Sequence, residues 1–538
     1  MILKGQTATF AARMGVAKRV GTLPDGGNVA EVDDAIATAI QSAATLGEAA
    51  DRVYSYPRRF TSPPFLHQRI TLAAGMMELL EHGRLFNLSE PGLGKSYSTI
   101  WMIDVMMRLG YVKKVLILAP KSTIYDPWRK EMFEAMPSVT VGLPIGSKAN
   151  REKELARGYA ITITNHHTAS TSLAALKAQH FDLVVLDEST VIKTANAKIT
   201  KDMVELVETA KYVLLLTGTP TAHSCLDSHG QLLVAKVPGV TKSLVRFKSA
   251  LGTMHGPFKW EPFHDARDRV MYMMQPAVRF DKRECLDLPP VISVYREVGI
   301  SKEQKHAHDN LIKDAVYELA HKGSGMTHTV TAVNAMSLMT KLLQVSAGIV
   351  WGEDDNGKRV AVRLDVKERM DDVISIIEQC SEKVVISATY TTTIHLLVEV
   401  LEARFGEGSV GVINGEVETK ARGEVIAKFQ DNNSKMRILL IHPKAAGHGI
   451  TLVAASTLIH WTPPMSTEVY LQACARIDRP GQKAACTTII HMVGIPLERE
   501  RYDAMAEKVD DQKQLLDAYT KLMKQHGISI RIGGSNEA

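Results

Sequence analysis

The sequence predicts an α/β protein with two parallel sheets covered by helices, and three observations support this prediction. Short apolar runs recur between helix-length amphipathic segments, which is typical of strands buried on both faces of a parallel sheet. The runs fall into two blocks, separated by a more helical stretch at about residues 240–350. The chain has 538 residues, which is too long for one compact core. We therefore expect two similar sheet domains.

The first block follows an N-terminal appendage, which is expected at residues 1–55 and should contain an Ala-rich helix at about 31–49. The first sheet domain is expected at residues 56–290, with a helical insert near 240–285. Its predicted strands are short, mostly apolar runs with the length of buried strands. These runs are Leu85–Leu88, Val115–Ala119, Ile161–Thr164, Leu183–Leu186 and Val213–Leu216.

The second sheet domain is expected at residues 291–510, with a helical insert near 300–347, and a C-terminal helix and tail should follow at 511–538. In the insert, Ser301 and Gln304 have the spacing of a capping box, which predicts that a helix begins there. The predicted strands of this domain are again short apolar runs. They are Val384–Ser387, Val410–Ile413, Ile438–Ile441 and Thr457–Ile459.

Composition limits the class of protein only broadly. Lys and Arg number 64 and Asp and Glu 59, so the net charge of +5 permits a nucleic-acid partner without requiring one. The five cysteines form no C-x-x-C pair, so neither a zinc ribbon nor a disulfide framework is expected. No run of apolar residues approaches the length of a membrane span. We expect a soluble protein of a reducing compartment, with no membrane association.

A glycine-containing loop is the sharpest functional signal in the chain. Ser89–Ser96 reads SEPGLGKS and stands between a predicted strand and a predicted helix. In that context Gly92 and Gly94 let backbone N–H groups close on phosphate oxygens at the N-terminus of the helix. Lys95 would then reach the terminal phosphates, and the Ser96 hydroxyl would bind Mg²⁺. The alternative is a glycine turn without a ligand.

Two adjacent carboxylates, Asp187 and Glu188, follow the predicted strand Leu183–Leu186. Ligands of α/β proteins bind at the carboxyl ends of the strands, where the chain leaves the sheet. Asp187 suits coordination of Mg²⁺, and Glu188 suits polarisation of an attacking water. Such a pair in isolation is usually a solvated turn. It lies about ninety residues after a phosphate loop and in register with further motifs, and together these predict the second half of a nucleotide site.

Read in order, these segments resemble the motifs of Swi/Snf-type ATPases of helicase superfamily 2, and specifically their short bacterial and phage members. One departure is the sequence Asp-Glu-Ser-Thr at residues 187–190, where the family commonly ends in His; a Ser or Thr there can still hydrogen-bond toward the next motif. The segments that carry the resemblance are Leu66–Gln68, Glu90–Ser96, Ile117–Trp128, Ile161–Asn165, Asp187–Thr190, Leu216–Pro220, Val384–Tyr390, Val412–Gln430, Ala446–Leu452 and Gln472–Gln482.

The resemblance implies two RecA-like lobes with short helical inserts, which bind ATP and Mg²⁺ between them. The catalytic residues that it implies are Lys95, Asp187, Glu188, Arg476 and Arg479, with Ser96 and Asp187 as Mg²⁺ ligands. The nucleotide-binding residues that it implies are Gln68, Pro91, Gly92, Leu93, Gly94, Lys95, Ser96, Gly449 and Gln472.

Arg476 and Arg479 are three residues apart, so a helix would present both on one face. A solvated basic stripe is the ordinary interpretation of such a pair. Here Gln472 precedes the pair and Gly481-Gln482 follows it, as in the last motif of the family. Planar guanidinium groups suit the charge that develops on transferred phosphoryl oxygens. We therefore expect two arginine fingers that act when the second lobe closes on nucleotide held by the first.

The expected function is that of an ATPase that hydrolyses ATP to ADP and phosphate and moves along duplex DNA without unwinding it. We expect it to be a monomer in the cytoplasm of a bacterial cell or a phage-infected host. A strand-separating helicase, a motor subunit of a restriction or defence assembly, and a nucleotide-gated binding module that scarcely hydrolyses ATP stay open as alternatives. The absence of a wedge among the helical inserts favours translocation.

Three tryptophans and one histidine pair have only structural roles in this interpretation. Trp128, Trp260 and Trp461 are expected to pack in the core rather than to stack on bases. His166 and His167 adjoin a predicted strand without a third ligand in view, so we expect no metal there.

Overall fold

The computed structural model describes residues 64–506 except 122, 194, 222–223, 256–258, 322–331, 354–358, 446–449 and 465, and before residue 64 only short pieces at 2–4, 14, 17–22, 28–32, 48, 50–51 and 54–56. The chain forms two compact units, Met1–Asp287 with Asp511–Ala538, and Leu288–Asp510. The helix expected at about 31–49 lies almost entirely outside the described residues, and the C-terminal helix and tail expected at 511–538 lie wholly outside them.

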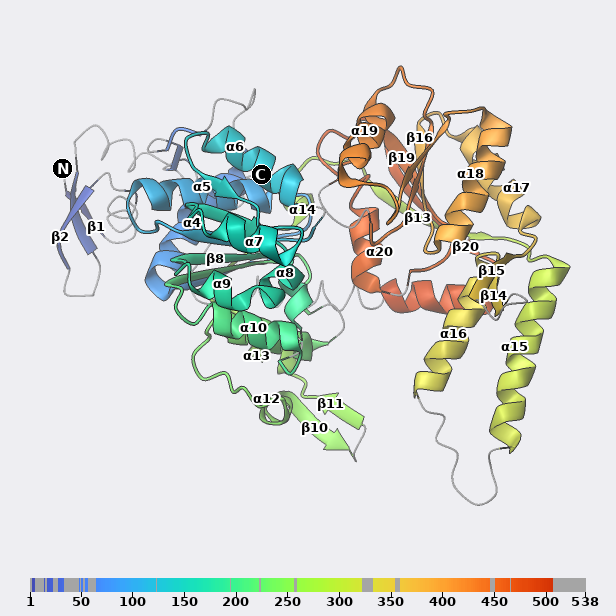
Figure 1. Ribbon diagram of the computed structural model, residues 1–538, viewed down its shortest axis with the longest axis horizontal. Coiled ribbons are helices and arrows are strands. Elements are labelled where there is room, and N and C mark those ends of the chain that lie inside the picture. The colour runs from blue at the N-terminus through green and yellow to red at the C-terminus, as the bar shows by residue number, and fades with distance from the viewer. Residues whose placement is uncertain are drawn as a thin grey trace, which may run out of the picture. The chain divides into compact units, whose positions relative to one another are not determined.

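The first unit is built on a seven-stranded sheet in which all the strands run parallel (Figure 1). The five strands that the sequence predicts in this block are present, with bounds shifted by at most one residue at each end. In spatial order the sheet consists of β12 (Ala277–Val278), β4 (Arg84–Asn87), β9 (Tyr212–Leu216), β8 (Leu183–Asp187), β5 (Val115–Leu118), β7 (Ile161–Thr164) and β6 (Val141–Gly142).

Both faces of this sheet are buried, which explains the continuous apolar runs. Along β8, Leu183 and Val185 join the core on one face, and Val184 and Leu186 join the core on the other. The first core includes residues of α4 (Leu66–His82), α5 (Lys95–Arg108) and α6 (Lys130–Ala135). The second includes residues of α7 (Lys148–Leu155), α8 (His166–Thr171), α9 (Leu173–Lys177), α10 (Lys198–Leu206), α11 (Ser228–Val234), α12 (Leu244–Leu251) and α13 (Ala266–Met273).

The insert near 240–285 is not wholly helical, so this expectation was wrong in part. After α12 the chain forms an antiparallel hairpin of β10 (Gly252–His255) and β11 (Lys259–Pro262), which projects from the first unit in Figure 1. β12 then pairs with β4 as an edge strand of the main sheet, and α14 (Lys282–Cys285) follows. Strands of two to four residues are too short to show a clear apolar alternation, so the sequence pattern could not reveal them.

Near the N-terminus, the appendage contains a three-stranded antiparallel sheet that the sequence interpretation missed. Its strands are β1 (Ile2–Lys4), β3 (Asn28–Val32) and β2 (Ala17–Thr22).

The second unit is built on a six-stranded parallel sheet. In spatial order it consists of β13 (Val291–Glu297), β20 (Thr487–Val493), β19 (Ala455–His460), β16 (Lys383–Ser387), β18 (Ile438–Ile441) and β17 (Val410–Ile413). Residues of α17 (Lys367–Gln379) and α18 (Thr391–Phe405) pack in the core on one face, and residues of α19 (Thr419–Gln430) and α20 (Thr467–Cys474) pack in the core on the other. Two parallel α/β sheets, each covered by helices, confirm the predicted fold class.

A pair of helices, α15 (Lys302–His321) and α16 (Ala332–Ser346), projects from the second unit (Figure 1). The predicted capping box is confirmed: Ser301 N–H donates to Gln304 Oε1 over 3.1 Å, and Gln304 N–H donates to Ser301 Oγ over 3.2 Å. An antiparallel hairpin, β14 (Ile349–Glu353) and β15 (Arg359–Arg363), follows and was not expected. None of the helices in the described part of the chain combines the length and the apolar character that crossing a bilayer requires.

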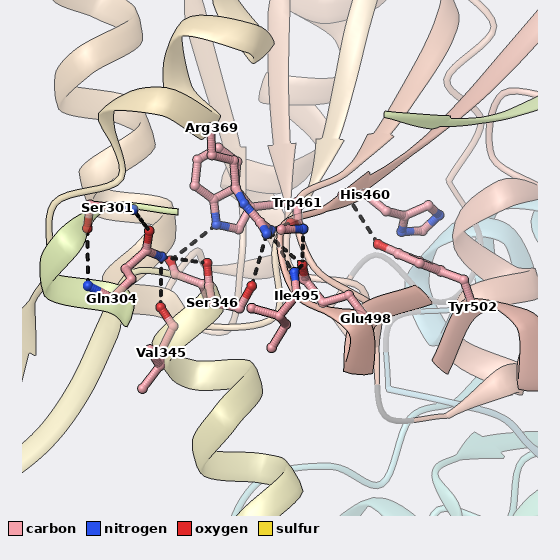
Figure 2. A network of polar contacts seen from close by, with 12 residues as sticks. Ser301, Gln304, Val345, Ser346, Arg369, His460, Trp461, Ile495, Glu498 and Tyr502 are labelled. Atoms are coloured by element: carbon pink, nitrogen blue, oxygen red, sulfur yellow. Dashed lines mark hydrogen bonds and ion pairs between the residues drawn. The ribbon is translucent and has the colours of Figure 1, made fainter. Parts of the chain in front are cut away.

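A buried ion pair ties the base of these helices to the sheet core (Figure 2). Arg369 on α17 donates to both carboxylate oxygens of Glu498 over 3.0 and 2.6 Å, and the two side chains are only 1% and 0% exposed. Arg369 also donates to Ser346 Oγ over 2.9 Å and to the Trp461 carbonyl. Elements far apart in the sequence therefore meet at one guanidinium.

We expect Glu498→Ala to destabilise the second unit by about 3–5 kcal/mol, because it leaves the charge of Arg369 buried without its partner. Urea unfolding of the full chain, followed by a probe in the second unit, measures this loss. Arg404→Ala is the matched control, since Arg404 pairs with Glu378 at the surface, where the side chains are 58% and 42% exposed. Such pairs contribute about 0–1 kcal/mol. Equal effects of the two variants would contradict the prediction.

Candidate nucleotide site

Three strands of the first sheet end at the same level and carry the predicted site residues at their ends. Asn87 of β4 pairs with Leu216 of β9, and Leu216 pairs with Asp187 of β8. Three segments therefore leave the sheet side by side at its carboxyl edge: the glycine-containing loop, residues 188–190 and residues 217–220. This is the edge at which α/β sheets bind ligands.

The glycine-containing loop has the backbone that the sequence predicts for phosphate binding. Gly92 and Gly94 have φ angles of +93° and +73°, which side chains rarely adopt, and α5 begins immediately after Gly94. The Lys95 Nζ donates to the carbonyls of Ser89 (2.6 Å) and Glu90 (3.1 Å). The ammonium group thus lies against its own loop, and the half-buried Ser96 occupies the first turn of α5.

Gln68 lies against the loop, as its place in the nucleotide-binding prediction requires. Its amide Nε2 donates to the Leu93 carbonyl over 3.3 Å, and a Cβ on Gly94 would lie 2.1 Å from the same nitrogen. The Gln68 Oε1 accepts from Phe65 N–H at the start of α4. The neighbouring His67 Nε2 lies 2.9 Å from the Leu93 carbonyl, and burial lowers the pKa of its imidazole. Sequence reasoning did not single out His67.

The other loop residues make contacts that keep the loop in place. Leu93 is buried, and Pro91 packs against Gly218, where an added Cβ would lie 2.6 Å from Pro91 Cδ. Glu90 Oε2 accepts from Lys282 N–H over 2.9 Å, and burial raises the pKa of this carboxyl. The insert after α13 therefore supports the loop, a contact that no sequence pattern indicated.

Asp187 is a half-buried carboxylate beside Lys95. Burial raises its pKa, whereas a hydrogen bond from Trp128 Nε1 to Oδ2 (2.7 Å) and the positive charge of Lys95 oppose the rise. The structure thus brings Lys95 and Asp187 together, as the sequence predicts. His166 lies close by at the start of α8, where burial lowers the pKa of its imidazole to about 4, so it is neutral at pH 7.

Glu188 adopts a left-handed backbone with φ +55°, which is uncommon for a residue with a side chain. Its Oε1 accepts from Thr190 Oγ1 over 2.9 Å and from Thr217 Oγ1 over 3.4 Å. The sequence predicts a hydrogen bond from the end of Asp187–Thr190 toward the next motif. In the structure this link is indirect, because Thr190 and Thr217 both donate to the Glu188 carboxylate. Two hydroxyl groups hold one oxygen of this carboxylate.

In the second unit, Arg476 and Arg479 do not share a helix face, so that expectation was wrong. α20 ends at Cys474, and both arginines lie in the turns that follow. Arg476 Nε donates to Gln472 O and Arg479 Nε donates to Ala475 O, each over 2.9 Å. Each guanidinium thus donates to the backbone carbonyl four residues earlier in the chain. Pro480 disfavours the helical backbone conformation for the residue before it, Arg479.

The same two arginines hold the segment that resembles the family's fifth motif. Arg476 Nη1 donates to Ile450 O over 3.1 Å, and Arg479 Nη1 donates to Thr451 Oγ1 over 3.0 Å. Burial lowers the pKa of Arg479 to about 10, so its guanidinium is still cationic at neutral pH. Gln472 is buried on α20, and Gly449 lies outside the described residues.

Comparison with known proteins identifies the family. The model of the SNF2-related domain matches residues 75–347, which is just over half of the chain, and the model of the helicase conserved C-terminal domain matches residues 368–481. The chain belongs to the SNF2-related family. This confirms the resemblance on which the motif assignments depend.

Among curated SNF2 relatives, the chain is 26% identical over 424 residues to the mouse SWI/SNF-related matrix-associated actin-dependent regulator of chromatin subfamily A member 1, and this match covers 73% of the chain and 38% of the relative. It is 24% identical over 465 residues to the ATP-dependent DNA helicase DDM1 of Arabidopsis thaliana, over 81% of the chain and 58% of the relative. Across the first relatives, the chain spans 36–58% of their length.

Among solved structures, the SWI2/SNF2 ATPase core of Sulfolobus solfataricus in complex with dsDNA aligns with a TM-score of 0.41 and 21% identity, over 88% of this chain and 98% of that one.

For the two arginines of this SNF2 chain, we expect Arg476→Ala and Arg479→Ala to leave nucleotide binding intact and to lower turnover by ~10-fold or more, because a finger acts mainly in the transition state and its neighbour remains. Steady-state ATP hydrolysis and equilibrium ADP binding measure the two effects. Arg437→Ala is the control, since Arg437 donates to the Ile377 carbonyl over 2.8 Å and precedes β18 at its amino end. Normal hydrolysis in either variant would show that the arginine replaced in it is not part of the site.

Proposed function

We propose that this chain is a nucleic-acid-stimulated ATPase that hydrolyses ATP to ADP and phosphate and moves along duplex DNA. The observation that carries the ATPase part is the alignment of the glycine-containing loop, Asp187–Glu188 and residues 217–220 at the ends of three adjacent strands. A turn without function would not need Lys95 beside a half-buried Asp187 or a left-handed Glu188 held by two hydroxyls.

Each residue of the loop has a defined task in this proposal. Backbone N–H groups from Gly92 to Ser96 bind phosphate oxygens at the N-terminus of α5. Lys95 exchanges its carbonyl partners, Ser89 and Glu90, for the terminal phosphates of ATP. Gln68 is proposed to contact the base, because its amide already lies at the loop.

The catalytic task falls to Glu188, Arg476 and Arg479. Glu188 orients and deprotonates the attacking water, with Thr190 and Thr217 fixing the direction of its carboxylate. Arg476 and Arg479 are proposed to neutralise charge on the transferred phosphoryl group, and Gln472 and Gly449 to contribute to nucleotide binding.

The residues at the edge of the first sheet also fit a magnesium ion. Asp187 is a half-buried carboxylate that has an acceptor oxygen beyond the indole bond, and Ser96 offers a hydroxyl in the first turn of α5. Carboxylate and hydroxyl oxygens are the ligands that Mg²⁺ prefers, and it usually keeps several waters. When bound, Mg²⁺ would neutralise charge on the β- and γ-phosphates.

Support for DNA as the partner comes from the family and from the names of relatives, one of which is an ATP-dependent DNA helicase. The net charge of +5 adds little. The first unit carries the β10–β11 hairpin, so the inserts are not wholly helical and do not by themselves exclude strand separation. Translocation without unwinding and action as a bacterial or phage cytoplasmic monomer remain our proposals.

The decisive experiment compares ATP hydrolysis without nucleic acid and with duplex DNA, single-stranded DNA and RNA. We expect the greatest stimulation by duplex DNA, reduced by added salt because phosphate contacts release counterions. A triplex on duplex DNA should lose its third strand when ATP is present, while a forked duplex stays paired. Unwinding of the fork would assign a strand-separating helicase, and stimulation by RNA alone would refute the DNA proposal.

A further inference from the structure

Trp128 is a fully buried tryptophan whose polar atom reaches the proposed magnesium ligand. It lies in a short π-helix, η1 (Ile124–Arg129), which precedes α6, and its side chain belongs to the core on the α4 face of the first sheet. The indole Nε1–H donates to Asp187 Oδ2 over 2.7 Å, across 59 residues of sequence. Packing in the core therefore explains the position of the Trp128 ring, as expected, but it does not explain the hydrogen bond of its N–H group.

The backbone of η1 explains how the indole comes to point at Asp187. Pro127 has no N–H group and cannot donate to the Thr123 carbonyl, which is its usual helical acceptor. Trp128 N–H donates to that carbonyl instead, over 3.0 Å, so the turn contains one additional residue. A helix advances about 100° per residue, so the additional residue changes the direction in which Trp128 leaves the helix. Such π-turns occur often at functional sites.

The bond to Asp187 leaves room for a cation. A carboxylate offers about four lone-pair sites; the indole, which has one donor and no acceptor, takes one of them, and the backbone N–H of Glu188 takes another. The indole cannot itself bind a cation through its nitrogen. Its effect is to fix the rotation of the carboxylate about the Cβ–Cγ bond and to direct the remaining lone pairs.

We infer that Trp128 is a positioning residue for magnesium binding: its indole N–H holds the Asp187 carboxylate in the orientation in which it binds the cation. This inference rests on the proposed function, because it takes Asp187 as the ligand. Groups that orient metal ligands in this way typically change metal affinity or activity by ~10–100-fold when they are removed.

The test is Trp128→Phe, which removes the N–H group and keeps an aromatic ring. We expect the Mg²⁺ concentration for half-maximal ATP hydrolysis to rise ~10–100-fold. A second readout avoids turnover: the Mg²⁺ concentration that half-saturates the stabilisation of the protein by ADP in a thermal melt should rise by a similar factor. ADP and Mg²⁺ are the probes in this measurement.

Trp101→Phe is the matched control. Trp101 is also fully buried in the first unit, and its ring packs against Tyr56 and Tyr97 on the same face of the sheet. This variant should lose stability by a comparable amount and keep the Mg²⁺ dependence of the wild type. If Trp128→Phe shows the same Mg²⁺ dependence as Trp101→Phe, Trp128 only packs and the inference is overturned.

A spectroscopic measurement keeps the inference testable if Trp128→Phe does not fold. Labelling the indole nitrogens with ¹⁵N gives signals from five tryptophans. We expect the indole signal that Asp187→Asn moves to be the one that Mg²⁺ with ADP moves in the wild type. If no signal responds to both, the inference fails. A wild type that neither hydrolyses ATP nor binds Mg²⁺ with ADP would overturn the proposed function, and this inference with it.

Discussion

Lys95→Ala should reduce ATP turnover to background, a loss of ~10²–10³-fold or more, the scale seen when one preorganised stabilising group is removed. The Lys95 ammonium group lies against the glycine-containing loop, beside the half-buried Asp187. Without it, the terminal phosphates and the carboxylate would face one another with less positive charge between them. Nucleotide affinity should fall as well, because we propose that Lys95 contacts ATP in the ground state. Hydrolysis with and without duplex DNA measures the first effect, and ADP binding measures the second.

The matched control for this variant is Lys114→Ala. Lys114 is also half-buried and donates to a carbonyl, that of Gln179, over 3.1 Å. It immediately precedes β5, at the amino edge of the same sheet, so its loss removes a similar side chain far from the proposed site. Near wild-type, DNA-stimulated hydrolysis in Lys95→Ala would end the assignment of the loop, and a comparable loss in Lys114→Ala would show that the effect is not specific to the site.

The main strands of the first unit could be predicted because each is marked by a short run of apolar residues that are adjacent in sequence. A run such as Val115–Leu118 is apolar at every position, which predicts burial on both faces, and its length is that of a strand in a parallel sheet. Once the strands are parallel, every carboxyl end lies at one edge, so residues about ninety positions apart, such as Lys95 and Asp187, are brought together. The candidate site followed from that geometry and from the spacing of its motifs.

The features that could not be predicted depend on contacts that leave no periodic signal. The indole bond from Trp128 to Asp187 requires a π-turn, and its only local mark is Pro127. α20 ends at Cys474, and the Gln472 carbonyl accepts from the Arg476 guanidinium. Sequence spacing describes an ideal helix, and it cannot show which donor a carbonyl accepts from.

The β10–β11 hairpin illustrates a different limit. Its strands have four residues each, and its packing depends on Trp260 Nε1, which donates to the Lys248 carbonyl of the preceding helix over 3.1 Å. A hairpin that is stabilised by contact with a helix needs little apolar alternation of its own, so its strands leave no signal in the sequence. Because the hairpin is present, the inserts of the first unit do not exclude a wedge that separates DNA strands.

Glu188→Gln should separate nucleotide binding from chemistry. We expect ATP and Mg²⁺ to bind nearly as in the wild type, and hydrolysis to fall by ~10²-fold or more, the scale expected when a general base is lost. The structure supports the separation, because the hydroxyls of Thr190 and Thr217 both donate to Oε1, and an amide oxygen can accept the same bonds. Single-turnover hydrolysis and ADP affinity give the two numbers independently.

Asp182→Asn is the control for this change of a carboxylate to an amide. Asp182 precedes β8, the strand whose other end carries Asp187 and Glu188, and it accepts from Lys113 N–H over 2.7 Å and from Lys114 N–H over 3.0 Å. Its replacement should cost some stability and leave the chemical step unchanged. If Glu188→Gln instead loses nucleotide affinity and keeps its rate at saturation, Glu188 is a binding residue, and its left-handed backbone serves to place a ligand contact rather than a base. Normal affinity with a lost chemical step is the result expected of a general base.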